Sequence, residues 1–259
     1  MNGEREEQRR ITRLALQAAG QEGGFALAGS GAIREHGLID RPTEDVDLFT
    51  IQQAQTRFDT SLDRIIAALR EHGYTVQTRH RQDGYAQLTI ISRHGLSTDM
   101  DLGVDWRTHP PVRLEVGPVL AIDDAVANKV GALFSRAETR DYLDVDAIRR
   151  SGRYRDDELL DLARQSDSGF DLEWFTKNLE HVDRIQPEEV RIYHVSPAQL
   201  AEVKQRTKTW AVHIRERMQR EQTRARLDAR IQGEIKHNDA APNDDADPER
   251  GCPSRGASR

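Results

Sequence analysis

The chain has 259 residues, and its 38 Lys and Arg against 44 Asp and Glu give a formal net charge of −6. Only 36% of the residues are hydrophobic, 32% are charged, and the mean hydropathy is −0.76. This composition is more polar than that of an average globular domain, so we expect part of the chain to be extended or disordered. The single cysteine, Cys252, excludes an internal disulfide framework and a multi-cysteine zinc site.

The sequence carries no sign of a membrane or secretory segment. Its N-terminal residues contain no apolar stretch of the kind found in signal peptides. No apolar run approaches the roughly 18–20 residues that a membrane-spanning helix needs. A lone cysteine suits a reducing compartment. We therefore expect a soluble, cytoplasmic protein with no membrane partner.

The pattern of apolar residues predicts an α+β fold, in which a mixed sheet has flanking helices and is followed by a helical C-terminal region. Asp123 is expected to cap the helix that follows it. Within the first 150 residues, helices are predicted at 5–20, 32–36, 57–72, 124–137 and 141–150, and strands at 25–28, 45–50, 74–79, 86–92 and 97–104.

The C-terminal part has a different composition. Short helices are predicted at 156–165 and 171–181, and a long charged helix from 197 to 236. That long segment holds ten Lys and Arg against five Asp and Glu, so it is basic within an acidic chain. It is either a solvated or coiled helix or a surface for RNA phosphates. We divide the chain into a core at 1–150, a helical region at 151–236 and a disordered tail at 237–259.

Asp45 and Asp47 form the first candidate site. They alternate with Val46 and Leu48, so on a strand both carboxylates project from one face. Two close carboxylates repel each other unless a cation lies between them, and oxygen ligands suit Mg²⁺ or Mn²⁺. Such ions support in-line phosphoryl transfer. A solvated acidic pair is the alternative.

A turn of small residues precedes this pair. Gly29-Ser30-Gly31 lies between a predicted strand and a predicted helix, where backbone N–H groups and the Ser30 hydroxyl can approach a phosphate. Taken alone, this segment is equally compatible with an ordinary tight turn. Its combination with Asp45 and Asp47, in this order, favours a nucleotide site.

A third carboxylate usually completes such a metal site. Asp99, Asp101 and Asp105 share one face of the strand predicted at 97–104 and its continuation, so strand periodicity does not choose among them. We favour Asp101, because it lies mid-strand between two apolar residues.

Lys129 is the only lysine in the first 176 residues, although the chain uses arginine freely. It lies at the edge of the apolar stripe of its predicted helix. It is either a snorkelling lysine with a solvated ammonium group or a point charge for a triphosphate.

Asp141 and Asp144 are neighbours on one face of the next predicted helix. Either carboxylate can orient Lys129, Arg136 or Arg140, or act as a base towards an attacking hydroxyl. The alternative is acidic charge that complements the helix dipole.

Four blocks of sequence together resemble the AbiEii/AbiGii toxin family of nucleotidyltransferases, within the DNA polymerase β-like superfamily. The blocks are Gly29-Ser30-Gly31-Ala32-Ile33-Arg34-Glu35-His36-Gly37, Arg41-Pro42-Thr43-Glu44-Asp45-Val46-Asp47-Leu48-Phe49, Asn128-Lys129-Val130-Gly131-Ala132-Leu133-Phe134-Ser135-Arg136 and Arg140-Asp141-Tyr142-Leu143-Asp144. The resemblance covers residues 20–150.

The resemblance implies a nucleotidyltransferase core, an NTP substrate and a separately encoded antitoxin. It implies that Gly29 and Ser30 bind the nucleotide, that Asp45 and Asp47 bind metal with Asp101 as third ligand, that Lys129 contacts the triphosphate, and that Asp141 is an essential acid. Some relatives transfer nucleotides to the 3′ end of tRNA, so RNA, and tRNA in particular, is the expected acceptor. A small hydroxyl compound such as an aminoglycoside, a protein acceptor, and a non-catalytic nucleotide-binding module remain alternatives.

Overall fold

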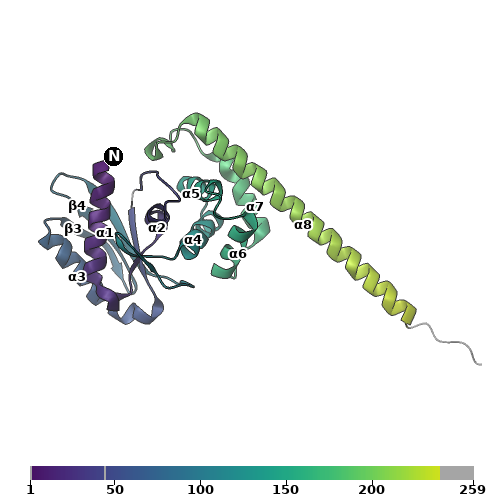
Figure 1. Ribbon diagram of the computed structural model, residues 1–259, viewed down its shortest axis with the longest axis horizontal. Coiled ribbons are helices and arrows are strands. Elements are labelled where there is room, and N and C mark those ends of the chain that lie inside the picture. Colours follow the sequence, from purple (N-terminus) through teal and green to yellow (C-terminus); the bar gives the residue numbers. More distant parts are fainter. Residues whose placement is uncertain (1, 44, 240–259) are drawn as a thin grey trace, which may run out of the picture. The chain divides into compact units, whose positions relative to one another are not determined.

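The fold is built on a seven-stranded mixed sheet, which the computed structural model describes within residues 2–43 and 45–239 (Figure 1). The strand order is β3-β4-β5-β2-β1-β7-β6. β2 runs parallel to β5, and β1 parallel to β7, whereas the other neighbouring pairs are antiparallel. The strands are β1 Ala26–Leu27, β2 Asp45–Thr50, β3 Thr75–Gln82, β4 Tyr85–Ile91, β5 Ser97–Val104, β6 Val112–Leu114 and β7 Gly117–Val119.

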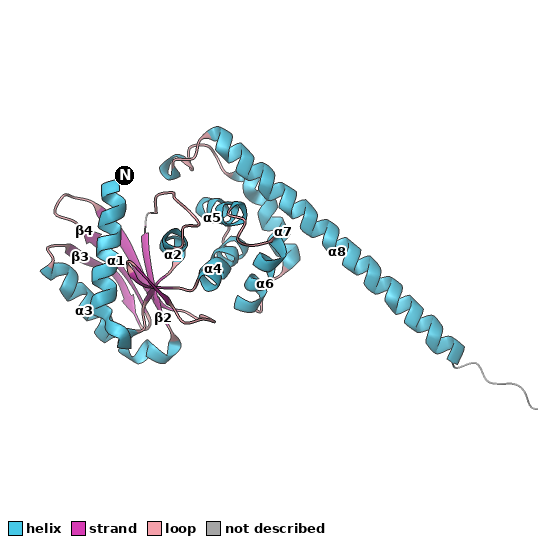
Figure 2. Ribbon diagram, viewed as in Figure 1, coloured by secondary structure: helices cyan, strands magenta, loops and turns pink. Residues whose placement is uncertain are grey.

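Helices cover the sheet on both faces (Figure 2). α1 and α3 pack against each other on one face, and α2 and α4 pack against each other on the opposite face. The helices of the core are α1 Asn2–Gly23, α2 Gly29–Glu35, α3 Phe58–Glu71, α4 Ile122–Ser135 and α5 Thr139–Arg150, and η1 Gln52–Arg57 is a short 3₁₀ helix.

The central strands place apolar side chains on one face and acidic side chains on the other. In β2, Val46 and Leu48 are buried, and the Thr50 hydroxyl donates to the carbonyl of Gly23 at the end of α1. Asp45 and Asp47 alternate with these buried residues along β2, so their side chains face the layer of α2 and α4. β5 repeats the pattern, since Met100 and Leu102 are buried. This alternation fixes the face of the sheet on which the acidic side chains lie.

A helical region follows the core. Phe175 of α7 packs edge-on against Trp210 of α8, and both rings are buried. The chain divides into two compact units, residues 1–214 and 215–259, and α8 continues from the first into the second. From 215 to 232 no described side chain is buried. The elements are α6 Asp156–Ser166, η2 His181–Arg184, η3 Arg191–Tyr193, α7 Leu172–Glu180 and α8 Pro197–Asp239.

The predicted α+β class is confirmed, and every predicted helix and strand of the core is present. β6 and β7 were not predicted, because each is three residues long and gives little periodicity. The capping role predicted for Asp123 is wrong: α4 begins at Ile122 with Ala121 at its N-cap, and Asp123 instead accepts a hydrogen bond from Tyr154. The predicted disordered tail begins too early, because residues 237–239 are still part of α8; its remainder lies outside the described residues.

No helix in the described ranges is both long enough and apolar enough to cross a membrane. The proposed division into a core, a helical region and a tail stays a prediction.

Candidate active site

Carboxylates from two parallel strands face one cavity of about 400 Å³. The β2–β5 register makes Asp47 the direct partner of Asp101, and Asp45 the partner of Asp99. Asp45, Asp47, Asp101 and Asp105 line the cavity, together with Gly29, Ser30 and Lys129. Six of the seven residues predicted from the sequence as site residues therefore meet at one place, although 100 positions separate the first from the last.

Gly29 permits the close approach of the turn to β2. Its φ is +55°, in the left-handed region, and an added Cβ would lie 1.7 Å from Oδ2 of Asp47. The backbone N–H of Ala28 donates to the carbonyl of Asp47 at 2.8 Å. Glycine is thus required at position 29 for two reasons: the turn needs a positive φ, and the Asp47 carboxylate leaves no room for a Cβ.

Ser30 and Lys129 form a buried polar pair beside the carboxylates. Nζ of Lys129 donates to Oγ of Ser30 at 2.7 Å and lies 2.9 Å from Oδ2 of Asp144. The Lys129 side chain is only 6% exposed, so its ammonium group does not reach bulk solvent. The snorkelling alternative is therefore wrong, because the charge is held inside the protein by specific partners.

Asp144 anchors this pair from behind. It is fully buried and accepts hydrogen bonds from Ser30 at 2.9 Å and from Nε of Arg41 at 2.7 Å. Burial alone would raise its pKa, but the adjacent Lys129 and Arg41 charges hold the pKa of Asp144 below its usual value. A charged Asp144 therefore compensates two cations that would otherwise be costly to bury.

Arg41 links this cluster to the helical region. Its guanidinium group donates to Oδ2 of Asp144 at 2.8 Å and to Oγ of Ser30 at 3.0 Å, and it lies 4.8 Å from the centre of the Tyr193 ring. The planar group thus makes hydrogen bonds with its edge and a cation–π contact with its face.

Asp45 and Asp101 have partners of their own. Nη1 of Arg140 donates to Asp45 at 2.8 Å, and the Tyr85 hydroxyl donates to Asp101 at 3.1 Å. Among the side chains described within 3–43 and 45–232, no three acidic, histidine or cysteine groups converge closely enough to hold a metal ion.

The charge of the site nevertheless calls for a cation. Burial, followed by repulsion from Asp45 and Asp101, raises the pKa of Asp47 to about 7, although Lys129 acts in the opposite direction. Burial also raises the pKa of Asp101. Three neighbouring carboxylates supply the oxygen donors that Mg²⁺ and Mn²⁺ prefer. The donor chemistry therefore fits such an ion, and Asp45, Asp47 and Asp101 are the residues that would hold it.

The structure separates the three candidates for the third carboxylate. Asp101 lies opposite Asp47 in the register and lines the cavity. Asp99 accepts a hydrogen bond from Thr89 at 2.7 Å and does not line it. Asp105 lines the cavity from beyond the end of β5, where the Asn128 amide donates to it at 3.4 Å.

Asp141 is the predicted residue that does not line the cavity. It is fully buried at the start of α5, where it accepts two hydrogen bonds from Arg136, at 2.9 and 3.0 Å, and one from the backbone N–H of Glu138. Arg136 itself lines the cavity. Asp141 therefore does not line the cavity itself, but it holds Arg136, which does.

Arg41 had no assigned role in the sequence, and the partner of Asp144 was left open among Lys129, Arg136 and Arg140. Arg41 lies in a loop, where no periodicity indicates direction. Asp144 was recognised as a neighbour of Asp141, but only the packing of α5 against α4 shows that it is the carboxylate that reaches Lys129.

The mixed sheet with a Gly-Ser turn, an Asp-x-Asp strand and a buried lysine defines a protein of the nucleotidyltransferase class. The profile of the family described as "Nucleotidyl transferase AbiEii toxin, Type IV TA system" matches residues 13–232. The chain belongs to this family of toxin nucleotidyltransferases. Among curated proteins, none matches the chain.

Solved structures share the fold at low sequence identity. JHP933 from Helicobacter pylori is 14% identical with a TM-score of 0.54, over 85% of this chain and 95% of that one. A protein described as a nucleotidyltransferase from H. pylori is 15% identical with a TM-score of 0.52, over 83% and 95%. MenT4, a nucleotidyltransferase toxin from Mycobacterium tuberculosis, is 17% identical with a TM-score of 0.48, over 78% and 81%.

Proposed function

We propose that this toxin transfers a nucleoside monophosphate from an NTP to RNA, with tRNA as the expected acceptor. The observation that carries the proposal is the Ser30–Lys129 pair, 2.7 Å apart, in the same cavity as Asp45, Asp47 and Asp101. This arrangement combines donors for phosphate oxygens with a set of carboxylates. Because NTPs and RNA are cytoplasmic, we expect the toxin to act in the cytoplasm.

One group of residues binds phosphate, and another group would hold a cation. Ser30 and Lys129 bind the triphosphate, and Asp144 with Arg41 holds both in position. A divalent cation bound by Asp45, Asp47 and Asp101 would neutralise charge on the reacting phosphate. The acceptor hydroxyl gives up its proton to water and its oxygen attacks the α-phosphorus. A new P–O bond forms, and pyrophosphate leaves with the electrons of the broken P–O bond.

Asp141 acts in this scheme as a positioning residue. Its two hydrogen bonds fix the guanidinium group of Arg136, which faces the cavity and can meet a phosphate oxygen. A third hydrogen bond, which Asp141 accepts from the N–H of Glu138, ties the same arginine to the start of α5.

The acceptor and the antitoxin are supported less directly. Membership of the toxin family supports a cognate antitoxin as partner. The basic segment 197–236, with its ten Lys and Arg, supports contact with RNA phosphates.

The test incubates the protein with Mg²⁺, each labelled NTP in turn and either total tRNA, an aminoglycoside or no acceptor. Label transfer to tRNA by the wild-type protein, abolished by EDTA and by Lys129→Met, is the expected result. Lys177→Met is the matched control, because Lys177 is exposed on α7 and pairs only with Glu173. Transfer to the aminoglycoside alone, or NTP binding without transfer to any acceptor, would contradict the proposal.

A further inference from the structure

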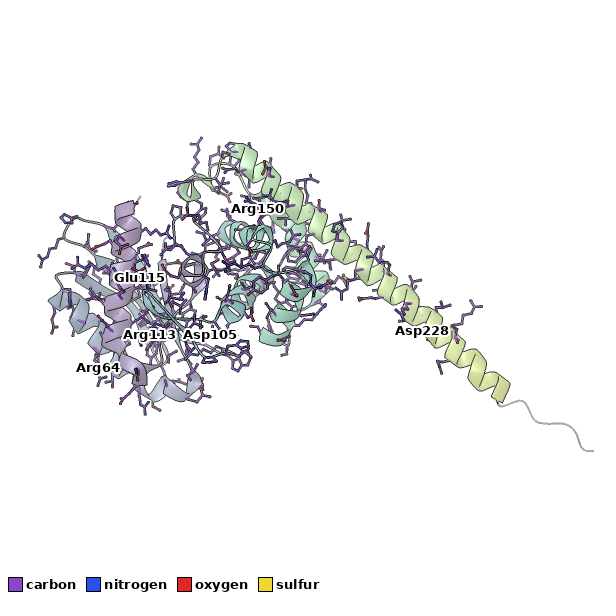
Figure 3. The ribbon with its side chains drawn as sticks, viewed as in Figure 1. Arg64, Asp105, Arg113, Glu115, Arg150 and Asp228 are labelled. Atoms are coloured by element: carbon purple, nitrogen blue, oxygen red, sulfur yellow. The ribbon has the colours of Figure 1, made fainter. Side chains whose placement is uncertain are left out.

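The chain leaves the active-site cavity through a loop at 105–111 that carries an exposed tryptophan. Asp105, labelled in Figure 3, lines the active-site cavity and also a second cavity of about 690 Å³. Trp106 follows it, lines the second cavity and is 60% exposed. The two cavities therefore meet at one residue.

The loop is held in place by hydrogen bonds. Buried Asp124 accepts from the backbone N–H groups of Thr108 and His109, at 3.2 and 2.9 Å. The N–H of Trp106 donates to Asp105 at 2.7 Å, and the Arg107 side chain donates to the carbonyl of Gly24 at 3.0 Å. The indole therefore projects from a fixed backbone, so a ligand that stacks on it does not have to order the loop.

The lining of the second cavity suits a nucleobase. The indole and the proline rings offer apolar faces, and side-chain amides offer donors and acceptors for the edge of a base. The volume lies in the range of small-molecule sites. The residues that contribute these groups are Gln52, Gln53, Trp106, His109, Pro110 and Pro111.

A single exposed tryptophan is not unusual, and Trp174 on α7 is 51% exposed. Trp174 lines neither of the two cavities. Trp106 differs because it combines exposure, a fixed backbone and a direct neighbour in the active site.

We propose that Trp106 is the stacking platform for the nucleobase at the 3′ end of the acceptor RNA. The inference rests on the proposed transfer to RNA and names the place where that RNA enters. Asp105 lies four residues beyond Asp101 along an extended strand, roughly 13 Å away. Ser30 and Lys129, the proposed phosphate ligands, line the active-site cavity and not the second one, so the NTP and the acceptor base have separate places.

The experiment compares steady-state kinetics of the wild-type protein with Trp106→Ala, Trp106→Phe and the control Trp174→Ala. Trp106→Ala should raise KM for RNA at least about 5-fold, the lower end for loss of one base–aromatic stack, with KM for the NTP unchanged. Trp106→Phe should restore most of the loss, and Trp174→Ala should match the wild type. An unchanged KM for RNA, or a raised KM for the NTP instead, would overturn the assignment.

An RNA without its terminal base makes the test specific. The wild-type protein should lose affinity for this abasic RNA, and Trp106→Ala should cause no further loss, because the stack is already absent. If Trp106→Ala weakens the abasic and the intact RNA equally, the residue does not stack on the terminal base.

A binding measurement separates this inference from the proposed function. A short single-stranded RNA should quench the fluorescence of Trp174→Phe, which retains Trp106, and should quench Trp106→Phe much less. Absence of label transfer by the wild-type protein would refute RNA modification. If the wild-type protein does transfer label but the two variants are quenched equally, RNA modification stands and only the role of Trp106 is refuted.

Discussion

Replacing Asp47 with Asn should make the protein more stable at alkaline pH, although it removes a central residue of the site. The pKa of Asp47 is raised from an ordinary value of 3.8 to about 7, by burial and by the neighbouring carboxylates. The native state therefore holds a proton on Asp47 that the unfolded chain has already released. Stability from this group is present at low pH and is lost as the pH rises through about 7.

The size of the effect follows from the width of that interval. Between pH 5 and pH 7 the native state binds about one proton more than the unfolded chain, at about 1.36 kcal/mol per pH unit. The free energy of unfolding of the wild type should thus fall by roughly 2 to 3 kcal/mol between pH 5 and pH 8 because of Asp47. Asp47→Asn has no charge to bury, so it should escape this loss.

The assay is urea unfolding followed by circular dichroism at pH 5, 6, 7 and 8 in EDTA. The difference in unfolding free energy between Asp47→Asn and the wild type should grow by roughly 2 to 3 kcal/mol towards pH 8. Asp161→Asn, which removes an exposed carboxylate on α6, controls for the loss of one charge. A difference that stays constant with pH would refute the electrostatic reasoning about the site.

A divalent cation should also change the unfolding free energy that depends on the charge of Asp47. At pH 8, Mg²⁺ at about ten times its dissociation constant should stabilise the wild type by about 1.4 kcal/mol. Asp47→Asn should gain much less, because it lacks a charged ligand. Equal stabilisation of both proteins would place the ion elsewhere.

Four further substitutions test the rest of the site. Asp144→Ala should lower the unfolding free energy by about 3–5 kcal/mol in a urea titration, because it leaves two buried cations uncompensated. Gly29→Ala should destabilise by more than about 1 kcal/mol, since the new Cβ meets Asp47 and φ is +55°, whereas Gly131→Ala, with open space around its Cβ, should stabilise by up to about 1 kcal/mol. Arg140→Met should tighten Mn²⁺ binding about 2- to 5-fold in calorimetry, because a competing cation leaves Asp45; weaker binding would mean that the arginine supports the ion.

The sequence predicted the acidic face of the sheet because strand periodicity depends only on local alternation. Asp45 and Asp47 could be assigned to one face from Val46 and Leu48 alone. The choice of Asp101 over Asp99 depended on register, which is a property of two strands. Register places Asp101 opposite Asp47, and a shift of one pair would have placed another residue there.

Side-chain partners on helices were less predictable. Asp141 and Asp144 lie on one helical face, yet one bonds Arg136 and the other bonds Lys129. The packing of α5 decides which partner each aspartate meets. Their three-residue spacing in the sequence does not predict this choice. The role of Arg41 was not predicted because its loop has a conformation fixed only by the residues that it contacts.

The hydrogen bond between Ser30 and Asp144 joins residues 114 positions apart. An incomplete chain that lacks α5 has no Asp144 to pair with Lys129 and leaves the phosphate-binding turn without its anchor. Activity therefore requires that the strands, α4 and α5 have all been synthesised and packed. The site is therefore completed only when residues from both ends of the core have come together.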